Sequence, residues 1–358
     1  MLSDTVLRNT INIFITNLQR KQIKGAYHIG RACADIMRTI VSSMTKKDTV
    51  QQVIDQCRLV AVMLKQAQPT MFVIGNVVRR VLYIIRDEYA QSNSGTQQTV
   101  SADSLHQPNL ANLLEAKAEL DYTKPVEGDF KANILSEIKE LISELDNMNE
   151  GISEVAIEHV HSNEVILTIG QSHTVEHFLK VAAEKKKKFE VVVTEHAPSY
   201  SGHELVKSLS EKGISATLIS DAAAFAIMSR VNKVIVGTHS VMANGGLIAP
   251  SGTHLVALAA KKKSVPFVVC CGLYKLTPMY PLDQDSFNDL CNPSEVIPPE
   301  LYNLKDAHVL NPCYDYVPPE LIDLFIMNET GTHNPQYIYR VLAEYYDTRD
   351  YDLGVYQD

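Results

Sequence analysis

Five short apolar runs in the second half of the chain constrain the fold more than any other feature. They are VILTI (165–169), FEVVVT (189–194), ATLIS (216–220), KVIVG (233–237) and PFVVC (266–270). Each run is separated from the next by a segment long enough for a crossover helix, which is typical of strands in a parallel sheet. The second half therefore predicts a Rossmann-like α/β domain, in which ligands bind beyond the carboxyl ends of the strands.

The first half of the chain is patterned for helices. Apolar residues recur at helical spacing over 4–90, and again over 110–120 and 130–157. We therefore expect an α/β fold class, with an N-terminal helical bundle over residues 1–150 and a Rossmann-like parallel-sheet domain over residues 151–358.

Glycine and proline are expected to divide the helical half, because both residues interrupt helices. Gly25, Pro69 and Gly75 are the predicted breaks. Residues 91–109 (QSNSGTQQTVSADSLHQPN) offer almost nothing to bury and predict a flexible loop.

The end of the chain predicts two helices. After Cys271 the sequence is rich in proline. One helix is expected to open at Pro318 and Pro319, and a second at Pro335, because proline is favoured in a first helical turn.

Composition excludes several classes of protein. With 358 residues, 45% of them hydrophobic, the chain can bury a core without metals or disulfides. A net charge of −9 argues against nucleic-acid binding, and the lysine runs at 185–188 and 261–263 are expected to cap helix ends. The N-terminus, MLSDTVLRNTINIF, lacks the features of a signal peptide, and no apolar run is long enough to span a membrane. We expect a cytosolic protein.

Cysteine spacing predicts reduced thiols. The six cysteines form neither a C-x-x-C pair nor a dense framework, so we expect free thiols without a metal or redox role. They are Cys33, Cys57, Cys270, Cys271, Cys291 and Cys313. The adjacent pair, Cys270 and Cys271, is expected to point to opposite faces of one strand.

One segment matches a zinc-protease pattern. Residues 173–177 read HTVEH, which is H-x-x-E-H, in which two histidines one turn apart bind zinc. The segment opens a helix after the first strand of the predicted sheet, and no third ligand can be identified. We therefore expect polar residues in the first turns of a helix and predict no metal site.

Polar residues follow several of the predicted strands and form a candidate crevice. The turn after the first strand could offer backbone N–H groups to an anion, or serve only as a turn. The residues after the second and third strands could form an acid–base pair, or Ser220 or Asp221 could cap the helix over 222–226. The crevice residues are Gly170, Gln171, Ser172, Glu195, His196, Asp221, His239 and Asn244.

Long strings in the second half resemble a known family. They include VILTIGQSHTVEHFL, EHAPSYSGHEL, SDAAAFAIMSRVNKVIVGTHSVMANGGL and DYVPPELIDLFI. These strings resemble the alpha, beta and delta regulatory subunits of eukaryotic translation initiation factor 2B, a family related to ribose-1-phosphate-type aldose–ketose isomerases. The resemblance covers most of the second domain, and the helical half is compatible with it.

The resemblance implies a chain without catalysis or cofactor. Where the isomerases have a catalytic cysteine this sequence has Gly170, their aspartate aligns with His239, and a lysine of theirs aligns with Pro250. Such groups act as a unit, so their joint loss is expected to abolish isomerisation.

The resemblance also implies partners. It predicts a regulatory subunit of the guanine-nucleotide exchange factor for initiation factor 2, assembled with alpha, gamma, delta and epsilon subunits and nearest to delta. The regulatory core is expected to recognise the alpha subunit of initiation factor 2 and its phosphorylated form. Two alternatives remain open: an isomerase with altered chemistry, and a homo-oligomeric sensor of a sugar phosphate or nucleotide.

Overall fold

The computed structural model describes residues 5–23, 25–45, 48–94, 122–123, 129–281, 288–301, 308–328 and 331–354. The chain divides into two compact units. Unit 1 comprises Met1–Gln68, Val77–Ser143 and Tyr345–Asp358, and unit 2 comprises Pro69–Asn76 and Glu144–Glu344. The C-terminal residues thus belong with the N-terminal helices. The domain boundary predicted at residue 150 stays a prediction.

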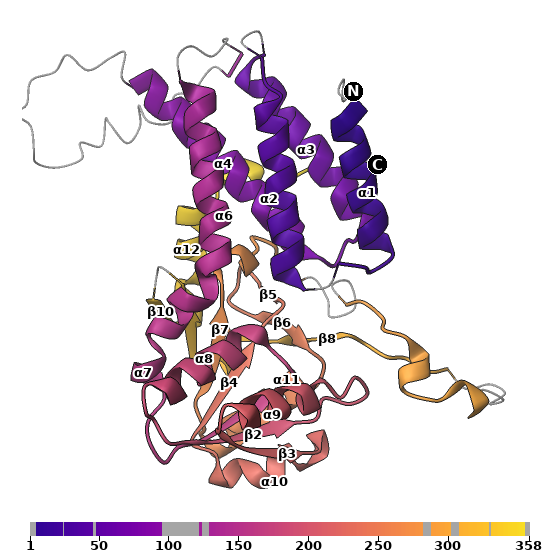
Figure 1. Cartoon of the computed structure of the whole chain (residues 1–358), viewed down its shortest axis with the longest axis vertical. Helices are drawn as coiled ribbons and strands as arrows, with labels where there is room; N and C mark the ends of the chain where they lie inside the picture. Colours follow the sequence, from indigo (N-terminus) through magenta and orange to yellow (C-terminus); the bar gives the residue numbers. More distant parts are fainter. Residues whose placement is uncertain are drawn as a thin grey trace, which may run out of the picture. The chain divides into compact units, whose positions relative to one another are not determined.

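Unit 1 is built from helices, as the apolar periodicity predicts. Figure 1 shows them in indigo to magenta. They are α1 (Thr5–Gln19), α2 (Ala26–Ser42), α3 (Val50–Ala67) and most of α4 (Phe72–Ser94) and α6 (Phe130–Glu154).

Two of the three predicted helix breaks are correct. Gly25, with φ 89°, separates α1 from α2, and Pro69 lies between α3 and α4. The break predicted at Gly75 is wrong, because the apolar pattern around this residue continues through the first turns of α4.

The predicted loop over 91–109 begins too early, since α4 continues to Ser94. The Gln91 side chain donates to Asp87 and the Ser92 hydroxyl to the Glu88 carbonyl, one turn back, so polar side chains extend the helix. Residues 95–109, and the helix predicted over 110–120, lie outside the described residues.

Unit 2 centres on a sheet of seven described strands in the order β10-β9-β7-β4-β1-β2-β3. Six of them run parallel, and five of these match the five apolar runs: β1 (Val165–Ile169), β2 (Glu190–Thr194), β3 (Ser215–Ile219), β4 (Lys233–Gly237) and β7 (Phe267–Cys271).

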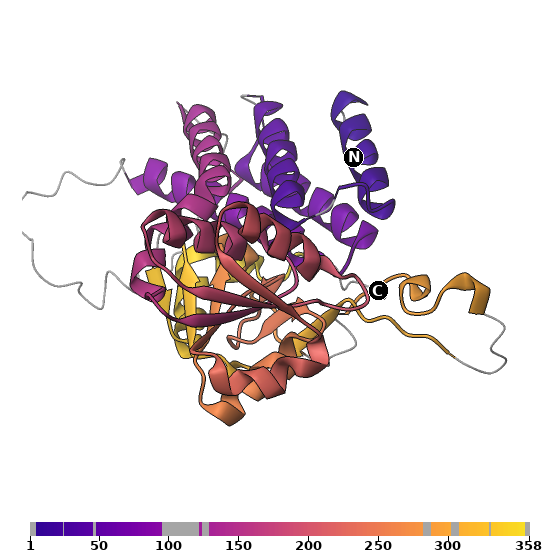
Figure 2. The same cartoon turned by 60° about the horizontal axis from the view of Figure 1, so that its bottom comes forward.

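Helices cover both faces of this sheet. Figure 2 shows α8 (His173–Glu184) and α9 (Ser201–Glu211) over one face, with α10 (Ala224–Ile227) and α11 (Thr253–Lys263) over the other. The short α7 (Ala156–His159) precedes β1. The predicted α/β fold class, with helices before a parallel sheet, is confirmed.

The first of the two predicted terminal helices is wrong. Only one turn of 3-10 helix, Pro319–Leu321, forms there, and β9 (Leu324–Met327) follows it. Phe325, Ile326 and Met327 are buried beside β7, because β9 pairs parallel with that strand. β10 (Gly331–His333) then pairs antiparallel with β9, and α12 (Ile338–Tyr345) follows Pro335 as predicted.

A second, three-stranded sheet follows β4. It consists of β5 (Ser240–Val241), β6 (Leu247–Pro250) and β8 (Tyr314–Val317), paired antiparallel in the order β5-β6-β8. This sheet carries the polar segment between β4 and α11. None of the described helices has the combination of length and apolarity that crossing a bilayer requires.

The prediction of six reduced cysteines is wrong for one pair. Cys291 and Cys313 form a disulfide, with their Cα atoms 5.6 Å apart, whereas Cys33, Cys57, Cys270 and Cys271 are free and buried. Spacing along the chain could not reveal the pair, because the backbone brings together residues separated by 22 positions.

A buried carboxylate fastens the C-terminal segment within unit 1. Asp350 is fully buried and accepts two hydrogen bonds from Arg86, at 2.7 and 3.1 Å, and one from Arg58, at 2.6 Å. Buried Arg79 donates to the backbone carbonyls of Asp350 and Tyr351. Loss of the carboxylate would leave buried arginine charge without a counter-ion.

Asp350→Asn should therefore lower the free energy of unfolding by about 3–5 kcal/mol. The matched control is Asp35→Asn, whose ion pairs with Arg31 and Arg38 lie on the surface of α2 and should contribute at most about 1 kcal/mol. Urea denaturation of both variants measures the difference. Equal losses would contradict the role of Asp350.

Candidate functional site

The turn after β1 uses its own backbone N–H groups. The Gly170 N–H donates to the Thr194 carbonyl at 3.3 Å, and the Gln171 N–H donates to the Ser201 hydroxyl at 3.3 Å. Ser172 caps α8 by accepting from the Val175 N–H, and its side chain packs on Gly237 of β4, where a Cβ would collide with it. The donors of Gly170 and Gln171 therefore already have protein acceptors.

Gly170 is surrounded too closely to carry a side chain. Its φ is +54°, a conformation that glycine adopts most readily. A Cβ at this position would lie 2.9 Å from the Ser201 Oγ and 3.2 Å from the His196 Cβ. The space next to the end of β1 is thus already occupied by residues that follow β2.

The turn after β2 is held by Asp221. Its Oδ1 accepts from the His196 N–H at 2.9 Å and its Oδ2 from the Ala197 N–H at 2.7 Å. Within the part of the chain that the structure describes, the Ser220 side chain makes no cap bond at the start of the next helical turn. Both oxygens of the Asp221 carboxylate are bound to the turn after β2. Asp221 therefore fixes the backbone of that turn and does not cap the helix that follows it.

The His196 imidazole contacts two serine hydroxyls. Its Nδ1 lies 2.8 Å from the Ser199 Oγ and 3.0 Å from the Ser201 Oγ. Burial lowers the pKa of His196, although Asp221 and Asp315 act in the opposite direction. Glu195 extends the ladder between β2 and β3, since its N–H donates to the Ile219 carbonyl at 2.9 Å.

His239 is a neutral side chain stacked on a tyrosine. Its ring lies 4.4 Å from the Tyr314 ring, and its Nε2 lies 3.2 Å from the Thr70 carbonyl. A carbonyl oxygen only accepts, so Nε2 carries the hydrogen. Burial lowers the pKa of His239 to about 4, and the nearby Lys275 adds to this effect. The ring is therefore uncharged near neutral pH.

Asn244 closes the turn between β5 and β6. Its Oδ1 accepts from the Gly246 N–H at 3.0 Å, and its Nδ2 donates to the Tyr316 hydroxyl at 2.7 Å. Gly245 in the same turn has φ +82°, and a Cβ there would crowd the Pro335 carbonyl. Both hydrogen bonds of the Asn244 side chain therefore stabilise this turn.

Two further residues take part in this region and were missed by the sequence analysis. The Asp315 Oδ2 accepts from the Gly252 N–H at 2.7 Å and the His254 N–H at 3.1 Å, at the N-terminus of α11. The buried Lys275 donates to the Thr238 carbonyl at 2.8 Å, and burial lowers its pKa. No sequence signal pointed to Asp315, because it is more than 60 positions from the groups that it binds.

The H-x-x-E-H residues have protein partners. His177 bonds through Nδ1 with the Ser153 hydroxyl at 2.8 Å, and Glu176 accepts from Lys180 at 2.6 Å and from the Ser208 hydroxyl. The His173 side chain is 85% exposed. Among the described residues, no group of three His, Cys, Asp or Glu is placed to hold a metal ion.

A family model describes most of the chain. The model of the initiation factor 2 subunit family matches residues 22–335. The chain belongs to this family. The relationship predicted from the strings of the second half is thereby confirmed.

Individual relatives match over nearly the whole length. Translation initiation factor eIF2B subunit beta of Dictyostelium discoideum is 45% identical, covering 94% of this chain and 95% of that protein. The beta subunit of Schizosaccharomyces pombe is 39% identical, covering 95% and 96%. Ribose 1,5-bisphosphate isomerase of Pyrococcus furiosus is 30% identical over 91% of each chain. The isomerase is thus the more distant of these three relatives, and the predicted relationship to the regulatory subunits of the translation initiation exchange factor is confirmed at this level.

Solved structures agree with the sequence relatives. The crystal structure of eIF2B beta from Chaetomium thermophilum superposes with a TM-score of 0.72 at 26% identity, covering 98% of this chain and 94% of that one. The tetrameric eIF2B-beta2-delta2 complex from the same organism gives a TM-score of 0.71 at 26% identity, covering 95% of each. The fold of this chain is therefore similar to that of eIF2B beta.

The depressed pKa of His239 should make stability fall in acid. Histidine in an unfolded chain has a pKa near 6.5, so between about pH 6.5 and pH 4 the unfolded state binds more protons. The contribution of neutral His239 to the free energy of unfolding is fully present above this pH window and is lost as pH falls through it. Between pH 7 and pH 4.5, the free energy of unfolding should fall by about 1–2 kcal/mol less in the His239→Gln variant than in the original chain. This figure allows for the partial exposure of the side chain.

Urea denaturation at several pH values measures this effect. The matched control is His173→Gln, because the His173 side chain is exposed in the folded chain. The control should keep the pH dependence of the original chain. An equal change in the pH dependence of both variants would contradict the conclusion that His239 is neutral in the folded chain.

Gly170→Ala should destabilise the chain by about 2–4 kcal/mol, because a positive φ and close neighbours act together. The matched control is Gly213→Ala. Gly213 has φ +74°, but no described atom lies within 4 Å of the position its Cβ would take, so backbone strain alone should cost about 1 kcal/mol. Chemical denaturation separates the two, and an equal cost would show that the space beside Gly170 is open.

Proposed function

We propose that this chain is the beta-type regulatory subunit of the guanine-nucleotide exchange factor for translation initiation factor 2. One observation carries the proposal: the chain is similar to eIF2B beta subunits over nearly its whole length and nearly the whole of theirs. A relative of this kind, matched through helices and sheet alike, supports a shared role more strongly than a shared fold would.

The immediate partner in this proposal is the delta subunit. Support comes from the tetrameric eIF2B-beta2-delta2 complex of Chaetomium thermophilum, one chain of which is similar to this chain in fold. Alpha, gamma and epsilon subunits complete the assembly, which works in the cytosol. The alpha subunit of initiation factor 2 is the proposed binding target of the regulatory core.

The regulatory step is a shift between two arrangements of the assembly. With its delta partner, the chain forms a composite surface that binds phosphorylated initiation factor 2 more tightly in the less active arrangement. Such a shift requires a difference in affinity between the two arrangements, and its size limits the inhibition. This step places the chain in the integrated stress response.

The crevice residues serve as scaffold in this proposal. Gly170 stands where the isomerases have their cysteine, and the contacts around it leave no room for a thiol. His239 replaces their aspartate and is neutral. Pro250 replaces their lysine, and its carbonyl accepts from the Thr253 hydroxyl at 2.5 Å. The remaining candidates, including Gln171, Ser172, Glu195, Asp221 and Asn244, bind neighbouring parts of the chain.

The similarity to ribose 1,5-bisphosphate isomerase favours a second candidate, a phosphosugar ligand or substrate. Against catalysis stands the joint loss of the three groups, since such groups act as a unit. Thermal shift with sugar phosphates tests binding alone, because a ligand of the native state raises apparent stability.

Removal of this chain from a reconstituted exchange factor should remove most of the response to phosphorylation. With the chain present, phosphorylated initiation factor 2 should slow nucleotide exchange roughly tenfold, which is within the usual range of coupling between sites. Without it, the effect should be less than about twofold. Fluorescent nucleotide release measures both rates. Unchanged sensitivity in the depleted complex would rule out the proposed regulatory role.

A further inference from the structure

The segment between β7 and β8 leaves the sheet through a paired stem. We call this stem the neck, and it consists of residues 288–292 facing residues 311–314. The Cys291 N–H donates to the Asn311 carbonyl at 2.7 Å, and the Cys313 N–H donates to the Asp289 carbonyl at 2.8 Å. Leu290 and Pro312 form an antiparallel bridge between them. The two cysteines are therefore held side by side by backbone bonds.

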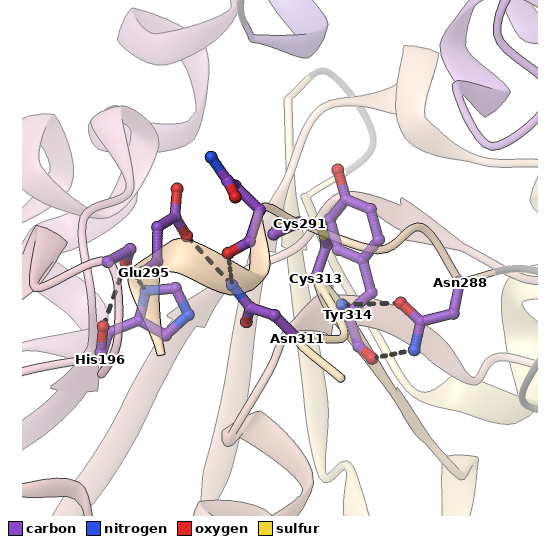
Figure 3. The surroundings of a disulfide bond; sticks show 9 residues. His196, Asn288, Cys291, Glu295, Asn311, Cys313 and Tyr314 are labelled. Carbon is purple, nitrogen blue, oxygen red and sulfur yellow. Dashed lines mark hydrogen bonds between the residues drawn. A yellow bond between two sulfur atoms is a disulfide. The ribbon is translucent and has the colours of Figure 1, made fainter. Parts of the chain in front are cut away.

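Side chains reinforce the neck at both ends. At the base, the Asn288 amide makes two bonds with the backbone of Tyr314, at 2.7 and 3.0 Å. At the far end, the Asn311 Nδ2 donates to the Asn292 carbonyl at 3.0 Å and to Glu295 at 3.1 Å. Figure 3 shows the Cys291–Cys313 disulfide within this set, and His196 of the crevice is drawn in the same surroundings.

Beyond the neck, the described residues bury little. Val296 is 45% exposed, Leu301 62% and Leu310 70%. Two single turns of 3-10 helix, Pro293–Glu295 and Pro299–Leu301, are the regular structure described there. Since such residues gain little from burial, the order of this part depends on the neck that closes it.

The bonded pair also differs from the other cysteines in its access to solvent. Cys291 and Cys313 are only half-buried. Cys33, Cys57, Cys270 and Cys271 are buried, and burial raises the pKa of the thiols of Cys33 and Cys57 to about 12. Thiol exchange needs an accessible sulfur and a thiolate, so it favours the neck pair over the other four.

We propose that Cys291 and Cys313 are a reversible thiol–disulfide pair whose redox state controls the order of the described residues in 288–301 and 308–313. The proposal rests on the cytosolic location proposed above, because disulfides in that compartment are usually transient and redox-sensing. The co-reactant is reduced glutathione, a thiol, in one direction and oxidised glutathione, its disulfide, in the other.

The exchange is balanced in both directions. One thiolate of the reductant attacks a sulfur of the pair, the S–S bond breaks, and its electron pair leaves on the other cysteine, which takes a proton. The thiolate of a second glutathione then attacks the glutathione sulfur of the mixed disulfide, and the remaining cysteine leaves and takes a proton. Oxidation by oxidised glutathione follows the same steps in reverse. Two electrons and two protons have moved to the chain, and the reductant has become a disulfide.

The contacts around Cys291 and Cys313 are compatible with both the disulfide and the reduced thiols. The backbone bonds of the neck do not involve the sulfur atoms, so they can keep the reduced thiols near each other for re-oxidation. Reduction nevertheless removes the cross-link that closes the loop, and the distal residues gain conformational freedom. Their aliphatic side chains are then presented on a looser segment.

Alkylation followed by mass spectrometry tests the pair in the full chain. The chain is equilibrated in buffers of stepped reduced-to-oxidised glutathione ratio and labelled in its native state. Cys291 and Cys313 should change from unlabelled to labelled together within the series, while the four buried cysteines stay unlabelled. A pair that stays bonded in every buffer, or never bonds, would overturn the proposal.

Hydrogen exchange supplies the structural readout. In the described amides of 288–313, exchange should become roughly tenfold faster on reduction, because the loop loses its closure. A Cys291→Ser and Cys313→Ser double variant should show the fast rate in both buffers. The matched control, Cys33→Ala in α2, should keep the redox response. Equal rates in the oxidised and reduced original chain would contradict the proposal, whatever the variants do.

The same samples separate this proposal from the proposed function. Capture of the delta subunit is measured in oxidised and reduced buffer. Failure of capture in both would contradict the proposed function and leave the thiol result intact. Intact capture with an inert cysteine pair would contradict the redox proposal alone.

Discussion

The carboxylate of Asp221 fixes the turn after β2, and the packing beside the end of β1 depends on that turn. By accepting from two successive N–H groups, it holds His196 at φ +59° and directs the following residues toward the end of β1. Ser201 and His196 then occupy the space that a side chain at position 170 would need. A charge-assisted pair of hydrogen bonds of this kind is among the stronger polar interactions in a protein.

Other groups around the crevice are used in the same internal way. Asp315 binds N–H groups at the start of α11, a place where helices commonly bind anions. His239 is stacked on Tyr314 and remains uncharged, and Lys275 is buried against the Thr238 carbonyl. The chain's own side chains therefore satisfy groups that an enzyme would direct at a substrate. These contacts are the physical support for the proposed scaffold role.

The pattern of apolar residues predicts those strands and helices whose burial depends on residues nearby in the sequence. The strands β1, β2, β3, β4 and β7 are short apolar runs flanked by helices, and each was found from sequence. The prolines before β9 predict a helix there, but pairing with β7 decides its conformation. Gly75 predicts a break, yet one glycine in a strongly apolar helix is tolerated at a modest cost in stability.

Side-chain partners were harder to predict than elements. Asp221 and Asn244 were found as candidates because they follow strands, but their partners lie on other turns and could not be read from spacing. Asp315 and the Cys291–Cys313 pair were missed or misread for the same reason. Asp315 and the cysteine pair find their partners through long loops, and the path of a long loop cannot be predicted from a single sequence.

The most direct measurement is an assay of the purified chain with ribose 1,5-bisphosphate, followed by NMR for conversion to the ketose isomer. If the crevice is filled and its reactive groups are gone, conversion should stay at the rate of the buffer blank at every chain concentration. Conversion that rises in proportion to the chain would contradict a scaffold without catalysis.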